Sequence, residues 1–264
     1  MFKNKRNRRS PLKETLLRYA GQSLDEELER VTGKVMEYCL LPVFMIVVAG
    51  YEWSQWYFHV PFQPWFLPVV AILLGVYSAI RIIPLLRLRR NLKQGRDGER
   101  WVGQQLETLH AQGFKVLHDI PSGRGNVDHI LIGPKGIFTI ETKTISKPEG
   151  QAEIHYDGNG VLINGIAPDR NPILQAKAES LWLHGLIEER TGKNFPVRPI
   201  VVYPGWYISK QPHGAEVWVL NEKALTSFLD QEEVRLQPED VELAYACLSH
   251  YVRSSTPELK GQHI

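Results

Sequence analysis

Two long uncharged segments dominate the first third of the chain. Residues 38–51 contain no Asp, Glu, Lys or Arg, and neither do the 28 residues between Glu52 and Arg81. This pattern predicts two apolar helices, over about 38–58 and 62–83, each close to the ~20 residues that a helix needs to cross a bilayer. Glu52 and several prolines interrupt the pattern, but membrane helices tolerate proline better than soluble helices do. We therefore expect a transmembrane hairpin in this part of the chain.

The residues around these segments predict how the hairpin is oriented. Lys and Arg residues precede the first apolar segment and follow the second, whereas the turn between them has none. Under the positive-inside rule, both ends then face the cytoplasm, as expected for a protein of the inner or plasma membrane. Two alternatives remain, a helical hairpin buried in a soluble protein and a re-entrant loop. Aromatic residues that suit a membrane interface cluster near the turn: Trp53, Trp56, Tyr57 and Trp65.

The rest of the chain alternates between helical and strand-like patterns. Asp97 resembles a helix cap, apolar residues follow it at helical spacing, and Gly113 predicts the end of that helix. The residues VDHILI and IFTIETKT flank the turn GPKG and predict a β-hairpin. The element order predicts a mixed α/β domain around a partly antiparallel sheet. Its other expected elements are a strand over 114–120, edge strands within 147–167, a helix over 171–191, strands over 197–204 and 215–220, and a helix capped by Asn221.

These patterns divide the chain into five expected regions. A basic and amphipathic N-terminal segment precedes the hairpin, and a basic linker follows it before the α/β domain and a C-terminal helical extension. The expected boundaries are 1–37, 38–83, 84–96, 97–222 and 223–264.

Charge and cysteine content exclude several classes of protein. The net charge of +2 divides into +8 over residues 1–96 and −6 over residues 97–264. Cys39 and Cys247 are too few for a disulfide scaffold or a four-cysteine zinc site. The first apolar run begins only near Tyr38, so we expect no cleavable signal peptide.

The β-hairpin brings candidate catalytic residues together. Closing the turn with Ile132 opposite Ile137, or with a tighter turn at Pro134 and Lys135, gives the same register and places Asp128 opposite Glu141. Opposed residues of an antiparallel pair share a face, and Lys143, two residues after Glu141, projects from that face too. Two carboxylates and one ammonium group are therefore expected side by side.

Such a group suits a hard divalent cation. Mg²⁺ prefers carboxylate oxygens and takes few protein ligands together with substrate phosphate. A neighbouring lysine can stabilise charge that develops on the phosphate or help to activate water. The alternative is that Lys143 simply neutralises an exposed acidic pair, Asp128 and Glu141.

Two further polar residues lie on apolar helix faces. Glu99 precedes Val102 by three positions, so its carboxyl is expected to face the sheet, although a first-turn Glu also suits the helix dipole. Gln175 lies three positions before Ala178 on the next predicted helix, where an ordinary polar residue near a helix start is the alternative.

Three segments of the sequence together resemble a known family, the nuclease-related domain (NERD). The residues that carry the resemblance are Gly98-Glu99, NVDHILIGPKGIFTIETKT and NPILQAKAE, in this order, within about Gly95 to Leu220. The family is assigned to the restriction-endonuclease-like PD-(D/E)xK superfamily, whose fold is a mixed sheet flanked by helices.

The resemblance implies roles for individual residues. Asp128 and Glu141 would bind Mg²⁺ or Mn²⁺, Lys143 would be the catalytic lysine, Glu99 an accessory acid and Gln175 an active-site polar residue. One departure concerns Thr144, because family members often have asparagine directly after the lysine.

The resulting hypothesis is a membrane-anchored nuclease, facing the cytoplasm, that hydrolyses phosphodiesters of nucleic acid. DNA is the expected partner on resemblance alone, and Arg124 is a candidate phosphate contact in the loop before Asp128. The net charge of −6 argues against this hypothesis, because duplex-binding surfaces are usually basic. The alternatives are a non-catalytic module that tethers nucleic acid or protein to the membrane, and a ligand-responsive membrane regulator with a degenerate site. The oligomeric state is left open.

Overall fold

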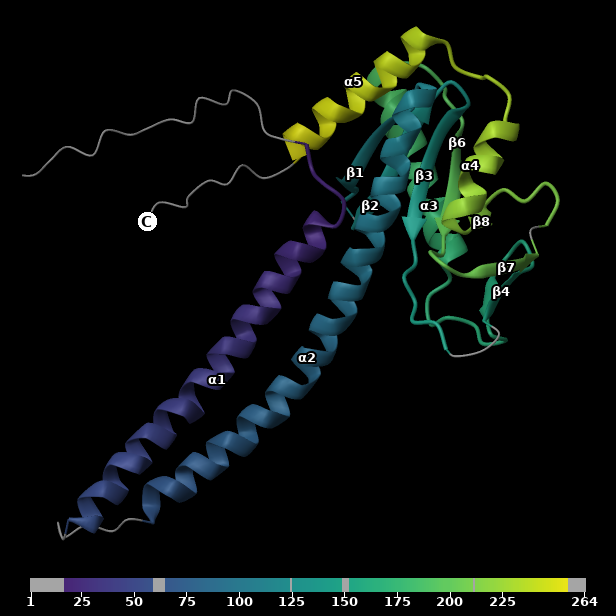
Figure 1. Cartoon of the computed structure of the whole chain (residues 1–264). Coiled ribbons are helices and arrows are strands. Elements are labelled where there is room, and N and C mark those ends of the chain that lie inside the picture. The colour runs from purple at the N-terminus through teal and green to yellow at the C-terminus, as the bar shows by residue number, and fades with distance from the viewer. Residues whose placement is uncertain (1–16, 59–64, 124, 149–151, 211, 256–264) are drawn as a thin grey trace, which may run out of the picture. The chain divides into compact units, whose positions relative to one another are not determined.

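The structure is a computed structural model, and it describes residues 17–58, 65–123, 125–148, 152–210 and 212–255 (Figure 1). The chain forms two compact units. One consists of residues 22–97, and the other of residues 1–21 together with residues 98–264.

The first unit is a hairpin of two long helices, α1 (Gln22–Tyr57) and the greater part of α2 (Phe66–Glu107). The helices run side by side (Figure 1), and Arg96 Nη1 of α2 donates to Oδ1 of Asp25 in α1 at 3.1 Å. Both helices are long and apolar enough to cross a membrane, as the sequence predicted. Many of their large apolar side chains are exposed, among them Leu40, Phe44, Val47, Ile72, Leu73 and Ile80.

Helix α2 continues past the point where a new helix was expected to begin. Asp97 does not cap a helix, because α2 runs without a break from the apolar segment to Glu107, and the expected start at Asp97 is wrong. The Asp97 carboxylate instead accepts a hydrogen bond from Arg96 Nη2 at 2.7 Å. The strong helix formers in residues 84–96, mainly Leu, Arg, Lys and Gln, favour this continuation. The short 3₁₀ helix η1 (Thr108–Gln112) follows, and Gly113 ends it at φ +82°.

The second unit contains a mixed five-stranded sheet with the strand order β1-β2-β3-β6-β8. Strand β2 is antiparallel to both of its neighbours, β1 and β3, whereas β6 and β8 continue the sheet in the direction of β3. The strands are β1 (Lys115–Pro121), β2 (Asn126–Gly133), β3 (Gly136–Thr142), β6 (Val197–Val202) and β8 (Trp218–Leu220). A smaller sheet of order β5-β4-β7 comprises β4 (Glu153–Tyr156), β5 (Val161–Ile163) and β7 (Tyr207–Lys210).

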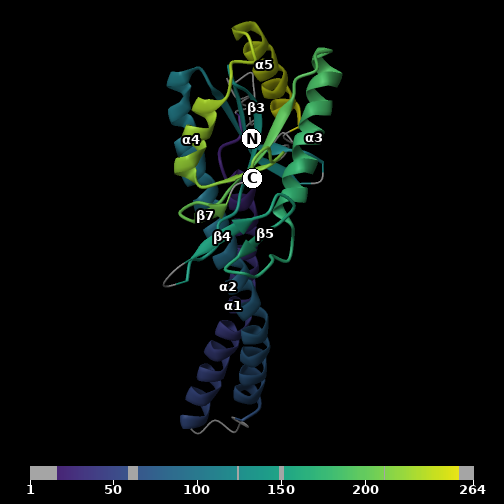
Figure 2. The ribbon, with the colours of Figure 1, turned by 90° about the vertical axis from the view of Figure 1, so that its right-hand side faces the viewer.

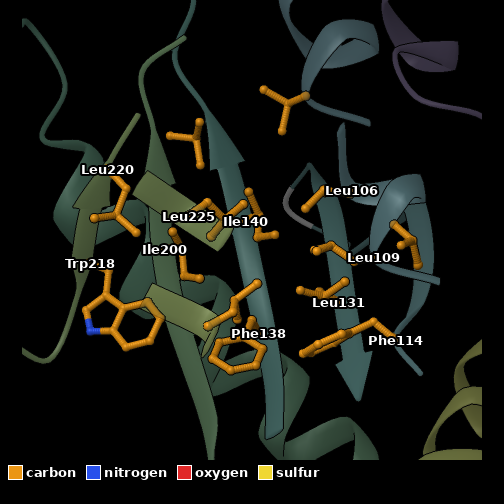
Figure 3. Close-up of a cluster of buried hydrophobic side chains, with 14 residues drawn as sticks. Leu106, Leu109, Phe114, Leu131, Phe138, Ile140, Ile200, Trp218, Leu220 and Leu225 are labelled. Atoms are coloured by element: carbon orange, nitrogen blue, oxygen red, sulfur yellow. The ribbon is translucent and has the colours of Figure 1, made fainter. Parts of the chain in front are cut away.

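Helices cover both faces of the main sheet, so the predicted class, an α/β fold with a mixed sheet flanked by helices, is confirmed (Figure 2). The end of α2, η1 and α4 (Glu222–Gln231) cover one face, where Leu106, Phe138 and Leu225 share an apolar core (Figure 3). Helices α3 (Pro172–Thr191) and α5 (Pro238–Ser255) cover the other face. As predicted, Asn221 caps α4, accepting from Ala224 N at 2.9 Å.

The hairpin of β2 and β3 has the predicted register. Ile132 pairs with Ile137 and His129 with Ile140, and Asp128 and Glu141 are the next residues in this register, just beyond the paired segment. Of the two predicted turns, the tighter one is present, because Gly133 pairs with Gly136.

The residues before α1 belong to the sheet unit. Arg18 is 9% exposed and forms a salt bridge with Asp119 at the end of β1, which is 2% exposed. Leu17 packs against the apolar core beneath α3 and α5, and Ala20 lies against Gly103, where an added Cβ would come within 2.9 Å. The α/β unit is therefore completed by a segment that precedes the helical hairpin in sequence.

Candidate active site

Asp128 and Glu141 lie on the face of the sheet that α3 covers. Side chains alternate along a strand, so Asp128 shares a face with Ile130, and Glu141 shares a face with Ile137. Both isoleucines belong to the core formed with α3 and α5. Asp128 Oδ2 accepts a hydrogen bond from the backbone N–H of Thr142 at 2.7 Å, which fixes this carboxylate against β3. Glu141 is only 4% exposed.

Lys143 connects the sheet to helix α3. Its Nζ donates to Glu141 Oε1 at 2.6 Å and to Gln175 Oε1 at 2.9 Å. Gln175 Nε2 in turn donates to Glu179 Oε1 at 2.9 Å. One chain of hydrogen bonds therefore joins three of the site residues that we predicted from the sequence, Glu141, Lys143 and Gln175.

The start of α3 explains why Gln175 reaches this site. Asn171 caps the helix by accepting from Ile173 N at 2.9 Å, and Pro172 occupies the first turn, where its missing N–H costs nothing. Residues four apart share a helix face, so Gln175 and Glu179 point in the same direction.

Glu179 is a site residue that the sequence analysis missed. Burial, followed by the charge of Glu141, raises the pKa of the Glu179 carboxyl to about 8, while its hydrogen bond from Gln175 acts in the opposite direction. The signal that could have identified it is its spacing of four residues from Gln175 within the stretch NPILQAKAE.

Glu99 lies close enough to the site to interact with its charges. Burial raises the pKa of its carboxyl to about 8, and the charges of Asp119 and Glu141 add to this effect. The preceding residue must be glycine, because a Cβ at Gly98 would lie 1.7 Å from Thr144 Oγ1. Close packing of α2 on the segment after β3 therefore holds Glu99 near Lys143, whose charge partly offsets the rise in pKa.

The site as a whole carries more carboxyl groups than positive charge. Burial, together with the charges of Glu141 and Glu99, raises the pKa of Asp128 well above its ordinary value, although the Thr142 N–H opposes the shift. Oε2 of Glu141 and Oε2 of Glu179 are buried and receive no hydrogen bond from an amide, hydroxyl or ammonium group of the described residues, and the contact between these two carboxyls adds to the rise in the pKa of Glu179. An added cation would relieve both the repulsion and the missing contacts.

The available donor set is oxygen, which suits a hard cation such as Mg²⁺ or Mn²⁺. Among the described residues, no group of three or more His, Cys, Asp or Glu side chains has the arrangement of a metal site. A cation here would therefore depend on one or two carboxylates together with water and substrate, which is the usual manner of Mg²⁺ binding.

The candidate phosphate contact, Arg124, lies outside the described residues. His129, which directly follows Asp128, lies on the opposite face of the strand because side chains alternate. It is fully buried, and its Nδ1 lies 2.9 Å from Nδ1 of His118.

Comparison with known proteins identifies the segment that carries this site. Residues 94–204 match the family model of the nuclease-related domain, NERD. The NERD segment begins within α2, ends just after β6 and contains Glu99, Asp128, Glu141, Lys143, Gln175 and Glu179. No curated protein and no solved structure matches the chain significantly. The family match supports a nuclease-related function for this segment.

Proposed function

We propose that the chain is a membrane-anchored nuclease that hydrolyses phosphodiesters of nucleic acid, with DNA as its substrate and Mg²⁺ or Mn²⁺ as its cofactor. The observation that carries this proposal is the cluster formed by Asp128 and by the linked side chains of Glu141, Lys143, Gln175 and Glu179. Acids on two neighbouring strands and a lysine beside the second acid support assignment of this cluster to the PD-(D/E)xK pattern.

Asp128 and Glu141 are the residues that would hold the cation. The buried Oε2 of Glu141 supports this assignment, because no amide, hydroxyl or ammonium group of the described residues donates to it and a buried carboxylate oxygen is costly without such a partner. A bound Mg²⁺ or Mn²⁺ would polarise the scissile phosphate and lower the pKa of the attacking water.

The remaining side chains position the reactants and balance charge. Water attacks phosphorus, one P–O ester bond breaks, and the products are a phosphate monoester and a free hydroxyl group. The Lys143 ammonium, held between Glu141 and Gln175, stabilises the negative charge that develops on the phosphate oxygens. Below pH 8, the raised pKa of the Glu99 carboxyl keeps it largely protonated, which limits its repulsion of the phosphate.

Hydrolysis by the full chain in detergent tests this proposal. Wild-type protein with Mn²⁺ or Mg²⁺ is expected to cleave labelled DNA, and chelation with EDTA is expected to stop cleavage. Asp128→Ala, Glu141→Gln and Lys143→Ala should each abolish cleavage. The exposed Glu189→Gln and Lys223→Ala serve as matched controls and should retain it. Undiminished cleavage by Glu141→Gln would overturn the mechanism.

The proposed anchor is a pair of spans formed by α1 and the apolar part of α2. The Arg18–Asp119 salt bridge supports this topology, because the residues before α1 and the domain after α2 must then lie on one side of the membrane. The basic residues at both ends of the hairpin favour the cytoplasmic side. Protease treatment of intact cells should spare epitope tags at both termini, and lysis should expose them. Digestion of either tag in intact cells would contradict two spans with cytoplasmic ends.

One observation favours the second candidate, a non-catalytic tether for nucleic acid or protein. Residues 97–264 carry a net charge of −6, which opposes the phosphate contacts that a nuclease needs. Metal binding separates the two functions. Titration of Mn²⁺ into the full chain should give a site that Asp128→Asn and Glu141→Gln remove, whereas a tether requires no such site.

A further inference from the structure

A cavity of about 550 Å³ lies next to the candidate active site. One wall is formed by Ser122, Gly125 and Asn126, and the other wall is the first half of α3. Gln175 and Glu179, which belong to the hydrogen-bond chain from Lys143, also line the cavity. A ligand in this cavity would therefore be in contact with the site itself.

One face of α3 gives this cavity its chemical character. Gln175, Ala178, Glu179 and Trp182 lie at positions i, i+3, i+4 and i+7, so all four line the same wall. Ala178 is exposed and small, which leaves the space open between the amide of Gln175 and the indole of Trp182. Tyr251 supports Trp182, because the centroids of their rings lie 5.9 Å apart. The wall thus combines a supported aromatic ring with polar groups.

The distribution of charge shows which part of a nucleotide suits the interior. The Glu179 carboxyl lines the cavity beside amide groups, and none of these groups offers positive charge to phosphate oxygens. Arg170, which is exposed and directly precedes the cap residue of α3, is the only cationic side chain among the described lining residues. A neutral base therefore fits the interior, where Trp182 can stack and the amides can form hydrogen bonds, whereas phosphate suits the side of Arg170.

We propose that this cavity receives the base of an unpaired nucleotide, so that the substrate of the proposed nuclease is a single-stranded or locally opened nucleic acid. The volume lies within the ~300–1,000 Å³ of small-molecule pockets. The bases of an intact duplex are paired and stacked, and one of them enters such a pocket only after it leaves the helix. This inference rests on the proposed function, because it assigns the substrate form to the same site.

Filling the cavity at Ala178 tests the proposal without changing a site residue. Leu has a helix propensity close to that of Ala, so Ala178→Leu at this exposed position should preserve α3 while its side chain occupies the cavity. Ala246→Leu is the matched control, because Ala246 is exposed on helix α5 and does not line the cavity. Binding is measured by fluorescence anisotropy on the full chain in detergent, with EDTA present to prevent hydrolysis. The probes are a short labelled oligodeoxynucleotide, the oligoribonucleotide of the same sequence, and the corresponding DNA duplex.

The expected result is a loss of single-strand binding in the filled variant alone. Ala178→Leu should raise the Kd for at least one single strand roughly 5- to 150-fold, the loss expected for one stacked base. Ala246→Leu should leave this Kd unchanged, and the Kd for duplex should change little in either variant. Trp182→Ala should show a similar loss and Trp182→Phe should recover part of it, because phenylalanine retains a ring for stacking.

Two outcomes would overturn the proposal. One is equal single-strand affinity in wild type, Ala178→Leu and Ala246→Leu. The other is an equal loss of affinity for single strand and duplex in Ala178→Leu, which would mean that the cavity does not bind an unpaired base. Hydrolysis with Mn²⁺, measured separately, distinguishes failure of this proposal from failure of the proposed function, since either result can occur without the other.

Discussion

The guanidinium of Arg18 donates to Oδ2 of Asp119 from both Nε, at 2.7 Å, and Nη2, at 2.6 Å, across 101 positions of sequence. Asn126 Nδ2 donates to the other carboxylate oxygen, Oδ1, at 2.7 Å. The charge of Asp119 also acts on Glu99. A residue that precedes the helical hairpin thus completes a buried cluster at the edge of the candidate active site.

Arg18→Met is expected to destabilise the protein strongly. The substitution leaves the buried Asp119 carboxylate without its cation, a loss that typically costs about 3–5 kcal/mol. Chemical unfolding of the full chain in detergent, followed by tryptophan fluorescence, measures the effect. Arg30→Met, at an exposed position of α1, is the control and should change little. The double variant Arg18→Met, Asp119→Asn should recover part of the loss, and an undiminished loss in the double variant would argue against the ion pair as its cause.

The α/β unit is expected to lose stability between about pH 4.5 and pH 8. The pKa values of Glu99 and Glu179 are about 8 in the folded protein, against 4.5 as the ordinary value. The folded state therefore holds more protons than the unfolded state in this range, so the free energy of unfolding falls as the pH rises to 8. The change is on the order of a few kcal/mol.

Glu99→Gln tests the source of this pH dependence. The neutral amide should flatten the decline, measured in EDTA by chemical unfolding at several pH values, and should make the variant more stable than wild type at pH 8. Glu189→Gln alters an exposed carboxyl of α3 and should leave the decline intact. A wild-type protein whose stability rises from pH 5 to pH 8 would contradict the raised pKa of these groups.

Gln175→Ala is expected to slow cleavage more than it weakens substrate binding. Gln175 accepts from Lys143 and donates to Glu179, so its loss frees the ammonium group from one of its two anchors. Loss of such a supporting contact commonly costs ~10- to 100-fold in activity. Steady-state kinetics should assign most of the loss to kcat, with Gln104→Ala, an exposed residue of α2, as the control. A change confined to KM would indicate that Gln175 contacts substrate without positioning Lys143.

Gly98→Ala is expected to destabilise the packing between α2 and the segment after β3. The new Cβ would lie 1.7 Å from Thr144 Oγ1 and 2.7 Å from Thr144 Cβ, so one of the two backbones must move. Overpacking of this kind typically costs about 1–3 kcal/mol. Thermal unfolding should show this loss, and adding Thr144→Gly should restore part of it by removing both atoms. Gly33→Ala in α1, where a Cβ meets nothing within 4 Å, is the control and should not destabilise.

Local patterns in the sequence predicted the helical hairpin, the helix capped by Asn221 and the β-hairpin. Asn221 caps its helix as expected, because a side-chain cap depends on only a few neighbouring residues. The start predicted at Asp97 failed because a capping residue does not end a helix that good helix formers already continue.

The sequence by itself determined that Asp128 and Glu141 share one face of the sheet. Alternation along the strands and the short turn leave one register that buries the apolar side chains, so a slip by one residue would turn every side chain to the other face. Tertiary packing alone decided that Arg18 neutralises Asp119 and that α3 brings Gln175 and Glu179 to Lys143. Arg18 and Asp119 are 101 positions apart, and Lys143 and Gln175 are 32 positions apart. Glu179 is linked to Lys143 through Gln175. No short repeat or spacing in the sequence encodes such contacts.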